Sequence, residues 1–89
     1  MATTVATVVR DNLDNAQIAR VLGVSWQKGS GNWSYIELRA PVILERIDAK
    51  GQIERKEELN KGQFLARQEG RLGIWIFDSS SIVPIKAAK

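Results

Sequence analysis

The sequence contains neither cysteine nor histidine among its 89 residues. The absence of cysteine excludes disulfide bonds, thiolate metal sites and a cysteine nucleophile. The absence of histidine removes the commonest acid–base catalyst and the commonest metal ligand of proteins. We therefore expect no zinc or haem site, no other metal or cofactor, and no enzymatic activity.

Long apolar runs are missing as well. The first nine residues, MATTVATVV, are interrupted by three threonines, and the first charged residue is Arg10, which does not fit a secretory signal. No apolar run approaches the ~18–20 residues that a transmembrane helix needs. Because the chain also lacks cysteine, it suits a reducing compartment, and we expect a cytoplasmic protein without membrane insertion.

A strong excess of one charge is also absent. The net charge is +3, from 13 basic and 10 acidic residues, and most of the excess lies in residues 61–89. Dedicated nucleic-acid-binding domains usually carry a denser basic cluster. A basic patch of Lys61, Arg67, Arg71 and Lys86 could contact phosphates, but the sequence favours reading Arg67 and Arg71 as ordinary solvated charges beside a turn.

The composition that remains is that of one small globular domain, with 44% apolar and 26% charged residues. The only stretch with linker composition is KGSGN at 28–32, which is too short to separate two domains. We expect a single small β-barrel-like domain over residues 1–89.

One helix is predicted over residues 15–22. Asp14 can cap its N-terminus, and Gln17 stands three residues later, as in a capping box. Gly23 is placed to end the helix in the left-handed conformation. Eight residues are too few for a stable isolated helix, so its apolar side must pack against the rest of the domain.

Short strands account for most of the other residues. Valine and threonine favour a strand over residues 3–9, and apolar side chains alternate with polar ones after Gly31. DAKG at 48–51 predicts a hairpin turn. The fold class is therefore α+β and mainly β: a small antiparallel curled sheet or SH3-like barrel of five to six short strands with one short N-terminal helix. An OB-type barrel is the alternative.

The last third of the chain resembles the end of an SH3-like barrel. Over residues 63–86, a strand is followed by a single turn, DSSS, and by a short final strand, IVPIK. GIWIFD at 73–78 is almost wholly apolar, which predicts a central strand buried on both faces. Trp75 is then expected in the core. If the sheet is covered on one side only, Trp75 and Phe77 are exposed and mark a binding site or a dimer seam.

Residues 17–25, QIARVLGVS, resemble the first helix and turn of a bacterial helix-turn-helix motif. That motif needs a second, recognition helix directly afterwards. The following residues, WQKGSGNW, contain two glycines in six residues, each of which costs about 1 kcal/mol in a helix. We therefore expect the recognition helix to be absent.

The strongest candidate binding site is the stretch around the glycine-rich loop. Its candidate partner-binding residues are Trp26, Lys28, Trp33, Tyr35 and Arg39. Aromatic side chains of this kind anchor protein partners and also stack on unpaired bases. Alternatively, Trp26 and Trp33 cover the core beside the helix.

These observations favour a non-catalytic protein-binding module, such as an accessory or adaptor subunit or an inhibitor docking on a larger protein. The alternative is a small β-barrel that binds single-stranded nucleic acid or RNA, and a helix-turn-helix DNA-binding protein is the second alternative. Self-association into a homo-oligomer remains open, because an exposed apolar strand can pair with its own copy.

Overall fold

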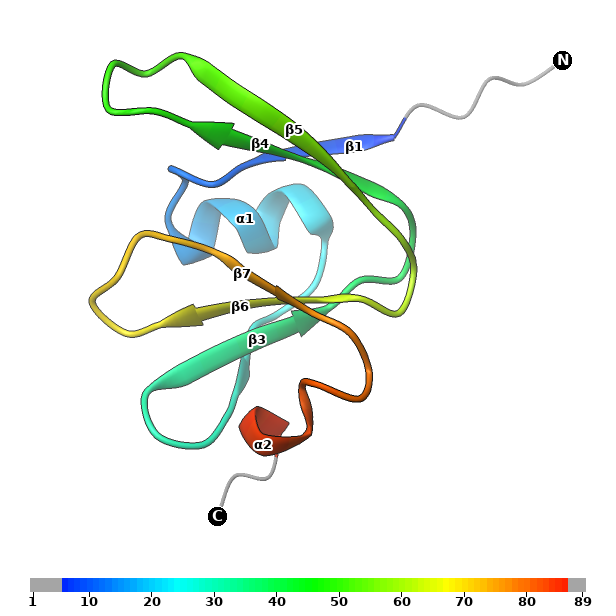
Figure 1. Cartoon of the computed structure of the whole chain (residues 1–89). Coiled ribbons are helices and arrows are strands. Elements are labelled where there is room, and N and C mark those ends of the chain that lie inside the picture. Colours follow the sequence, from blue (N-terminus) through cyan, green and yellow to red (C-terminus); the bar gives the residue numbers. More distant parts are fainter. Residues whose placement is uncertain (1–5, 87–89) are drawn as a thin grey trace, which may run out of the picture.

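A computed structural model describes residues 6–86, which form seven strands and two helices. Figure 1 shows their arrangement. In chain order they are β1 (Thr7–Arg10), α1 (Asn15–Leu22), β2 (Gln27–Lys28), β3 (Trp33–Glu37), β4 (Val42–Ile47), β5 (Ile53–Leu59), β6 (Phe64–Gln68), β7 (Trp75–Phe77) and α2 (Val83–Lys86).

The strands form two open sheets. One has the order β1-β4-β5, and the other has the order β2-β3-β6-β7. β1 runs parallel to β4, whereas all other pairs are antiparallel. The predicted fold class, α+β and mainly β with a short N-terminal helix, is confirmed. Neither sheet closes on itself, so the curled-sheet form is the one observed and the SH3-like and OB-type barrels are not. Residues 6–86 also hold more strands than the expected five or six.

The predicted helix is confirmed to the residue. The Asp14 carboxylate accepts a 2.8 Å hydrogen bond from the backbone N–H of Gln17, and the Gln17 side chain accepts one from the backbone N–H of Asp14. Gly23 ends the helix with a φ of 72°. Neither α1 nor α2 is long and apolar enough to span a membrane, and these are the helices of the described part of the chain.

The main core lies between the two sheets, beside α1. Its buried side chains come from β1, α1, β3, β4, β5, β6 and the neighbouring loops. They are Val9, Ile18, Ile36, Leu38, Val42, Leu44, Leu59, Leu65 and Ile74. Each side chain of this size contributes roughly 1.5–3 kcal/mol when fully buried, which supplies the packing that α1 cannot provide alone.

A second, smaller core lies on the opposite face of the four-stranded sheet. There Phe64 and Ala66 of β6 pack against Ile82 and Ile85. α2 therefore stands where a final strand IVPIK was predicted, and that prediction is wrong. Pro84 lies in the first turn of this helix, where its missing N–H loses no helical hydrogen bond.

The glycine-rich loop between β2 and β3 packs against α2. The Ser30 N–H donates a 2.7 Å hydrogen bond to the Ile85 carbonyl, and the Ser30 hydroxyl donates one to the Pro84 carbonyl. A Cβ at Gly29 would come within 2.7 Å of Ile85, so only glycine permits this approach. These contacts anchor the loop on α2. β2 and this loop follow α1 where a recognition helix would stand, as the sequence indicated.

The prediction that GIWIFD is a central strand is wrong. β7 is the last strand of its sheet and pairs with β6 alone among the described elements. Its apolar side chains lie on opposite faces of the sheet: Ile76 is half-buried towards the main core, whereas Trp75 lies on the outer face. An apolar run shows that the strand is hydrophobic, but it does not show whether the strand has one or two neighbouring strands in the sheet.

Candidate functional site

An aromatic surface covers the outer face of the four-stranded sheet at the free edge of β7. We use this name for Trp33, Trp75 and Phe77. The Trp33 ring meets the Trp75 ring edge-on, with centroids 6.4 Å apart, and meets the Phe77 ring at 5.9 Å. The residue of β6 between them is Ala66, which pairs with Trp75 and is completely buried. Its small side chain allows Trp33 to reach across β6.

Trp75 is the most accessible member of this surface. It is 54% exposed, contrary to the expected core position, because β7 has no neighbour beyond it. The alternative expectation, that Trp75 and Phe77 are exposed, is met by Trp75 alone, because the second core covers part of the same face of the sheet. Phe77 is half-buried, since Trp33 and the second core cover part of its ring.

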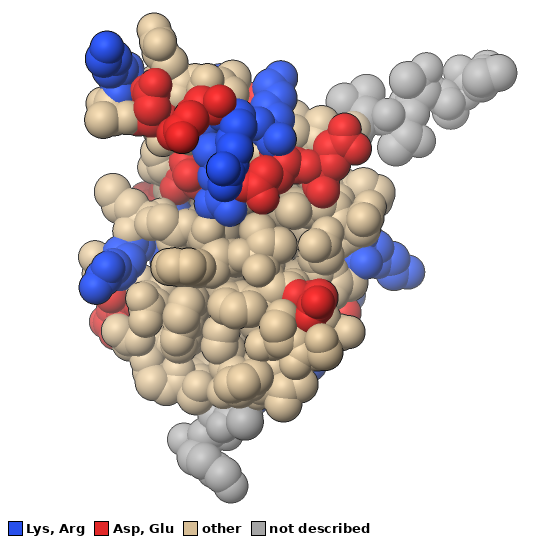
Figure 2. All heavy atoms as spheres, viewed as in Figure 1, with Lys and Arg blue, Asp and Glu red and all other residues tan. Residues whose placement is uncertain are grey.

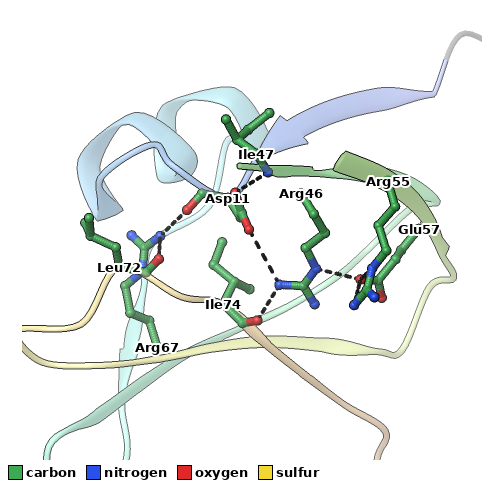
Figure 3. Close-up of polar contacts among 8 residues, drawn as sticks. All are labelled: Asp11, Arg46, Ile47, Arg55, Glu57, Arg67, Leu72 and Ile74. Carbon is green, nitrogen blue, oxygen red and sulfur yellow. Dashed lines mark hydrogen bonds and ion pairs between the residues drawn. The ribbon is translucent and has the colours of Figure 1, made fainter. Parts of the chain in front are cut away.

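The chain entering β7 is held by two arginines from different sheets (Figure 3). Arg67 of β6 donates a 2.7 Å hydrogen bond from Nη2 to the carbonyl of Leu72, and Arg46 of β4 donates one of 2.7 Å from Nη1 to the carbonyl of Ile74. Leu72 itself is 71% exposed. Residues 72–75 therefore present Leu72 and Trp75 to solvent from a backbone fixed on both sides.

Arg67 is a structural residue rather than part of a solvent-facing basic patch. It is only 4% exposed, and its guanidinium also donates to the Asn15 side chain and the Asp11 carbonyl. Its Nε has no hydrogen-bond partner among the described residues. Burial lowers the pKa of Arg67 below its ordinary value, while the nearby charges of Asp11 and Asp14 oppose that change.

Arg46 is the centre of a polar network that joins the two sheets. Its Nε donates to the Glu57 carboxylate, and its Nη1 lies 3.8 Å from a carboxylate oxygen of Asp11. The other Asp11 oxygen accepts a hydrogen bond from the backbone N–H of Ile47. The hydrogen bond from Arg46 is the main cause that lowers the pKa of Glu57, so this carboxylate stays ionised at neutral pH.

A cleft of about 560 Å³ runs between this network and β7. One wall is formed by residues 73–76, and the other by β4 and β5. The lining residues are Asp11, Arg46, Ile47, Glu54, Arg55, Glu57, Gly73, Ile74, Trp75 and Ile76. Trp75 thus belongs to the aromatic surface and also lines the cleft.

Charge is distributed unevenly over this side of the molecule. Figure 2 shows Lys, Arg, Asp and Glu gathered over β4 and β5, above a broad and almost uncharged surface. Strand β5 contains the charged residues Glu54, Arg55, Lys56, Glu57 and Glu58, whereas β7 contains no charged residue. The cleft lies where the two kinds of surface meet.

The candidate residues from the glycine-rich stretch are divided among separate places. Trp26 is partly buried against the main core, and its ring N–H donates to the Asn15 carbonyl, so it covers the core. Trp33 belongs to the aromatic surface. Tyr35 packs edge-on against Phe64, with ring centroids 6.1 Å apart. Lys28 and Arg39 are exposed.

The candidate basic residues do not form one patch. Lys28, Arg67 and Arg71 line a cleft of about 500 Å³ near the start of α1, which Asp14 and Glu69 also line. Tyr35, Arg39 and Lys86 line a smaller cleft of about 230 Å³. Lys86 lies 5.4 Å from the centre of the Phe64 ring, a cation–π contact. Lys61 lies in the turn between β5 and β6, apart from both clefts.

The described residues offer little for acid–base chemistry. The carboxylates with a shifted pKa, Glu57 and Asp78, are both shifted downwards. A general acid at neutral pH needs the opposite shift. No group of three or more acidic residues that could hold a metal ion occurs among residues 6–86.

Comparisons of the chain with protein-family models, curated proteins and solved structures found no significant match.

Proposed function

We propose that this protein is a non-catalytic protein-binding module of the cytoplasm, an accessory or adaptor subunit or an inhibitor, and that it binds its partner through the aromatic surface. The observation that carries the proposal is the exposure of Trp75 on a fixed backbone. A large aromatic side chain that is half exposed and already ordered loses little conformational entropy on binding. Tryptophan is also one of the residue types enriched among the dominant contacts of protein interfaces.

The surroundings of Trp75 support a protein partner. The surface over β6 and β7 is nearly uncharged, and charged residues border it over β4 and β5. An apolar centre with a polar rim is the usual anatomy of a protein–protein interface. Apolar partner side chains would bury Trp75 further, while the border charges keep the free protein from associating unspecifically.

Binding of single-stranded nucleic acid is the alternative, and it has less support. Stacking on bases would use Trp33 and Tyr35, and both are partly buried against the second core. Strand register places Lys28 in one row with Ser34 and Arg67, on the opposite face of the sheet. The basic and aromatic side chains would therefore need to contact a strand that wraps around the sheet edge.

Partner capture with matched variants tests the proposal. Proteins retained from the native host by immobilised wild-type chain are compared with those retained by Trp75→Ala and by Val21→Ala, an exposed apolar residue on α1. A captured protein is then purified, and its Kd for each chain is measured at about 50 and about 300 mM salt. We expect a loss of roughly 30-fold for Trp75→Ala, since a dominant interface contact contributes about 2 kcal/mol.

Two results would overturn this proposal. One is a partner that binds Trp75→Ala as tightly as it binds Val21→Ala. The other is tight binding of single-stranded DNA or RNA that weakens steeply between the two salt concentrations, because released counterions are typical of phosphate contacts.

A further inference from the structure

The four outer edges of the two sheets differ in their protection. β5 carries five charged residues, β2 has only two residues and includes Lys28, and β1 ends in Arg10, which pairs with Glu45. Charges and short length are the usual means of preventing a sheet edge from pairing with another chain. β7 is also short, but its three residues, Trp75, Ile76 and Phe77, are all apolar. It is the least protected edge of the described residues.

Backbone groups of β7 face the cleft of about 560 Å³. The Ile74 carbonyl points away from β6, since Arg46 of the other sheet meets it. Backbone polar groups alternate in direction along a strand, so the N–H and carbonyl of Ile76 point to the same side as the Ile74 carbonyl. No hydrogen bond from outside the sheet reaches Ile76 within residues 6–86. This position can accept one further strand.

We propose that the cleft beside β7 binds an extended segment of the partner protein, which adds to the sheet at Ile76 and carries a basic side chain for Glu54. The proposal rests on the proposed function and specifies the chemistry of the partner. Addition of a peptide strand to an exposed sheet edge is a recurrent mode of recognition, with affinity from backbone hydrogen bonds and specificity from side-chain contacts.

The charges that line the cleft select the basic side chain. Arg46 and Arg55 are both engaged with Glu57, and Arg46 also lies near Asp11. The side chain of Glu54 lines the same cleft and makes no ion pair or hydrogen bond among the described residues. The lining holds three carboxylates and two guanidinium groups, so one negative charge is uncompensated. A lysine or arginine of the bound segment would compensate it.

The shape of the cleft favours a single extended chain over a second copy of this protein. The wall opposite β7 is built by β4 and β5. A second copy that paired through its own β7 would bring its own hairpin of β4 and β5 to the same place. Apolar side chains of an extended segment would lie against Ile47 and Ile76 on one face and against Trp75 on the other, since successive side chains alternate.

Selection of phage-displayed random dodecapeptides on the intact chain tests this inference. We expect the enriched sequences to contain β-branched residues in alternation and a lysine or arginine beside them. The best peptide is synthesised and titrated against wild-type chain, and amide hydrogen exchange at Ile76 should slow by at least tenfold on binding. Methylation of the peptide amides that face β7 should weaken binding at least tenfold, whereas methylation of the amides that face away should change the Kd less than twofold.

Glu54→Lys and Glu58→Lys form a matched pair on β5, because both glutamates are exposed and only Glu54 lines this cleft. We expect Glu54→Lys to raise the Kd of the basic peptide at least fivefold and Glu58→Lys to change this Kd less than twofold. Failure to enrich any sequence, equal effects of the two methylation series, or equal effects of the two lysine variants would overturn the inference. So would concentration-dependent self-association of the wild-type chain that itself protects Ile76. A partner that requires Trp75 but is insensitive to Glu54→Lys would leave the proposed function standing without this inference.

Discussion

Arg46 donates a hydrogen bond of 2.7 Å from Nη1 to the carbonyl oxygen of Ile74. Arg46 belongs to β4 of one sheet, whereas Ile74 directly precedes β7 of the other, and both residues line the cleft. The contact ties the entry of β7 to β4 and leaves the following residues of the edge strand open. It therefore connects the rigidity of the exposed segment with its availability for binding.

Replacement of Arg67 should destabilise the fold strongly. Arg67→Met would leave the acceptor atoms of Asn15, Asp11 and Leu72 without this donor inside the protein. We expect a loss of about 3 kcal/mol in the free energy of unfolding, and about half as much for Arg67→Lys, which can still serve one or two acceptors. Urea denaturation measures both losses. A change below about 0.5 kcal/mol for Arg67→Met would show that these contacts do not hold the loops.

Gly29→Ala should disturb the seat of α2. The added Cβ would lie 2.7 Å from both the Ile85 side chain and the Ile85 carbonyl, and the backbone carbonyl cannot move without the helix. We expect a loss of about 2 kcal/mol, as for other overpacked sites. Gly73→Ala is the matched control, because nothing lies within 4 Å of its added Cβ. Thermal unfolding that affects both variants equally would contradict the role assigned to Gly29.

Asp78 should make the stability of the turn before α2 dependent on pH. Hydrogen bonds from Ser81 and Ser80 lower the pKa of its carboxyl from 3.8 to about 2. Since the folded state binds this proton more weakly than the unfolded state, the contribution of Asp78 is complete above pH 3.8 and is lost as the pH falls through about 2.

The comparison of wild type with Asp78→Asn checks this dependence. The urea midpoint of the wild type should exceed that of the variant at pH 7, and the two midpoints should converge as the pH approaches 2. Carboxyl chemical shifts followed by NMR give the pKa of Asp78 directly. A midpoint that follows the ordinary titration of a free aspartate would rule out the hydrogen-bonded turn.

Fluorescence quenching should distinguish the three tryptophans. Trp75 is 54% exposed, whereas Trp26 and Trp33 are partly buried. Trp75→Phe should therefore reduce quenching by acrylamide more than Trp26→Phe does. Trp26→Phe should also reduce stability, since the ring N–H of Trp26 donates a 2.8 Å hydrogen bond to the Asn15 carbonyl. Stronger protection in Trp26→Phe than in Trp75→Phe would place the exposed indole elsewhere.

The sequence was most informative where the determinants of structure are local. Asp14, Gln17 and Gly23 are sufficient to define α1, because each interacts with residues only a few positions away. Local rules could not distinguish a strand from a helix at residues 82–86, where Pro84 is compatible with the first turn of a helix as well as with a sheet edge. The docking of Ile85 on Phe64 and Ala66, which is long-range, decides for the helix.

The candidate site was predicted only in part. Trp33 was named, and the exposure of Trp75 was considered, but the choice depended on whether β7 had a second neighbour. Arg67 was read as a surface charge although its position gives a signal: it shares the inward face of β6 with Leu65, two residues earlier. Its partners Asn15 and Asp11 are more than fifty positions away, which no spacing rule reveals. Arg46 and Glu54 were not proposed as site residues. In the sequence they look like other surface charges, and only the fold places them together in the cleft.

The parallel pairing of β1 with β4 also fixes the order in which the molecule can be assembled. Arg10 aligns with Glu45, so β1 is synthesised more than thirty residues before the strand with which it pairs. The hairpin of β4 and β5 needs only a short turn, whereas closing the longer loop between β1 and β4 costs more chain entropy. During that interval the inward side of Val9 has no sheet to pack on. A nascent chain arrested before residue 47 should therefore be the form of this protein that chaperones bind most readily.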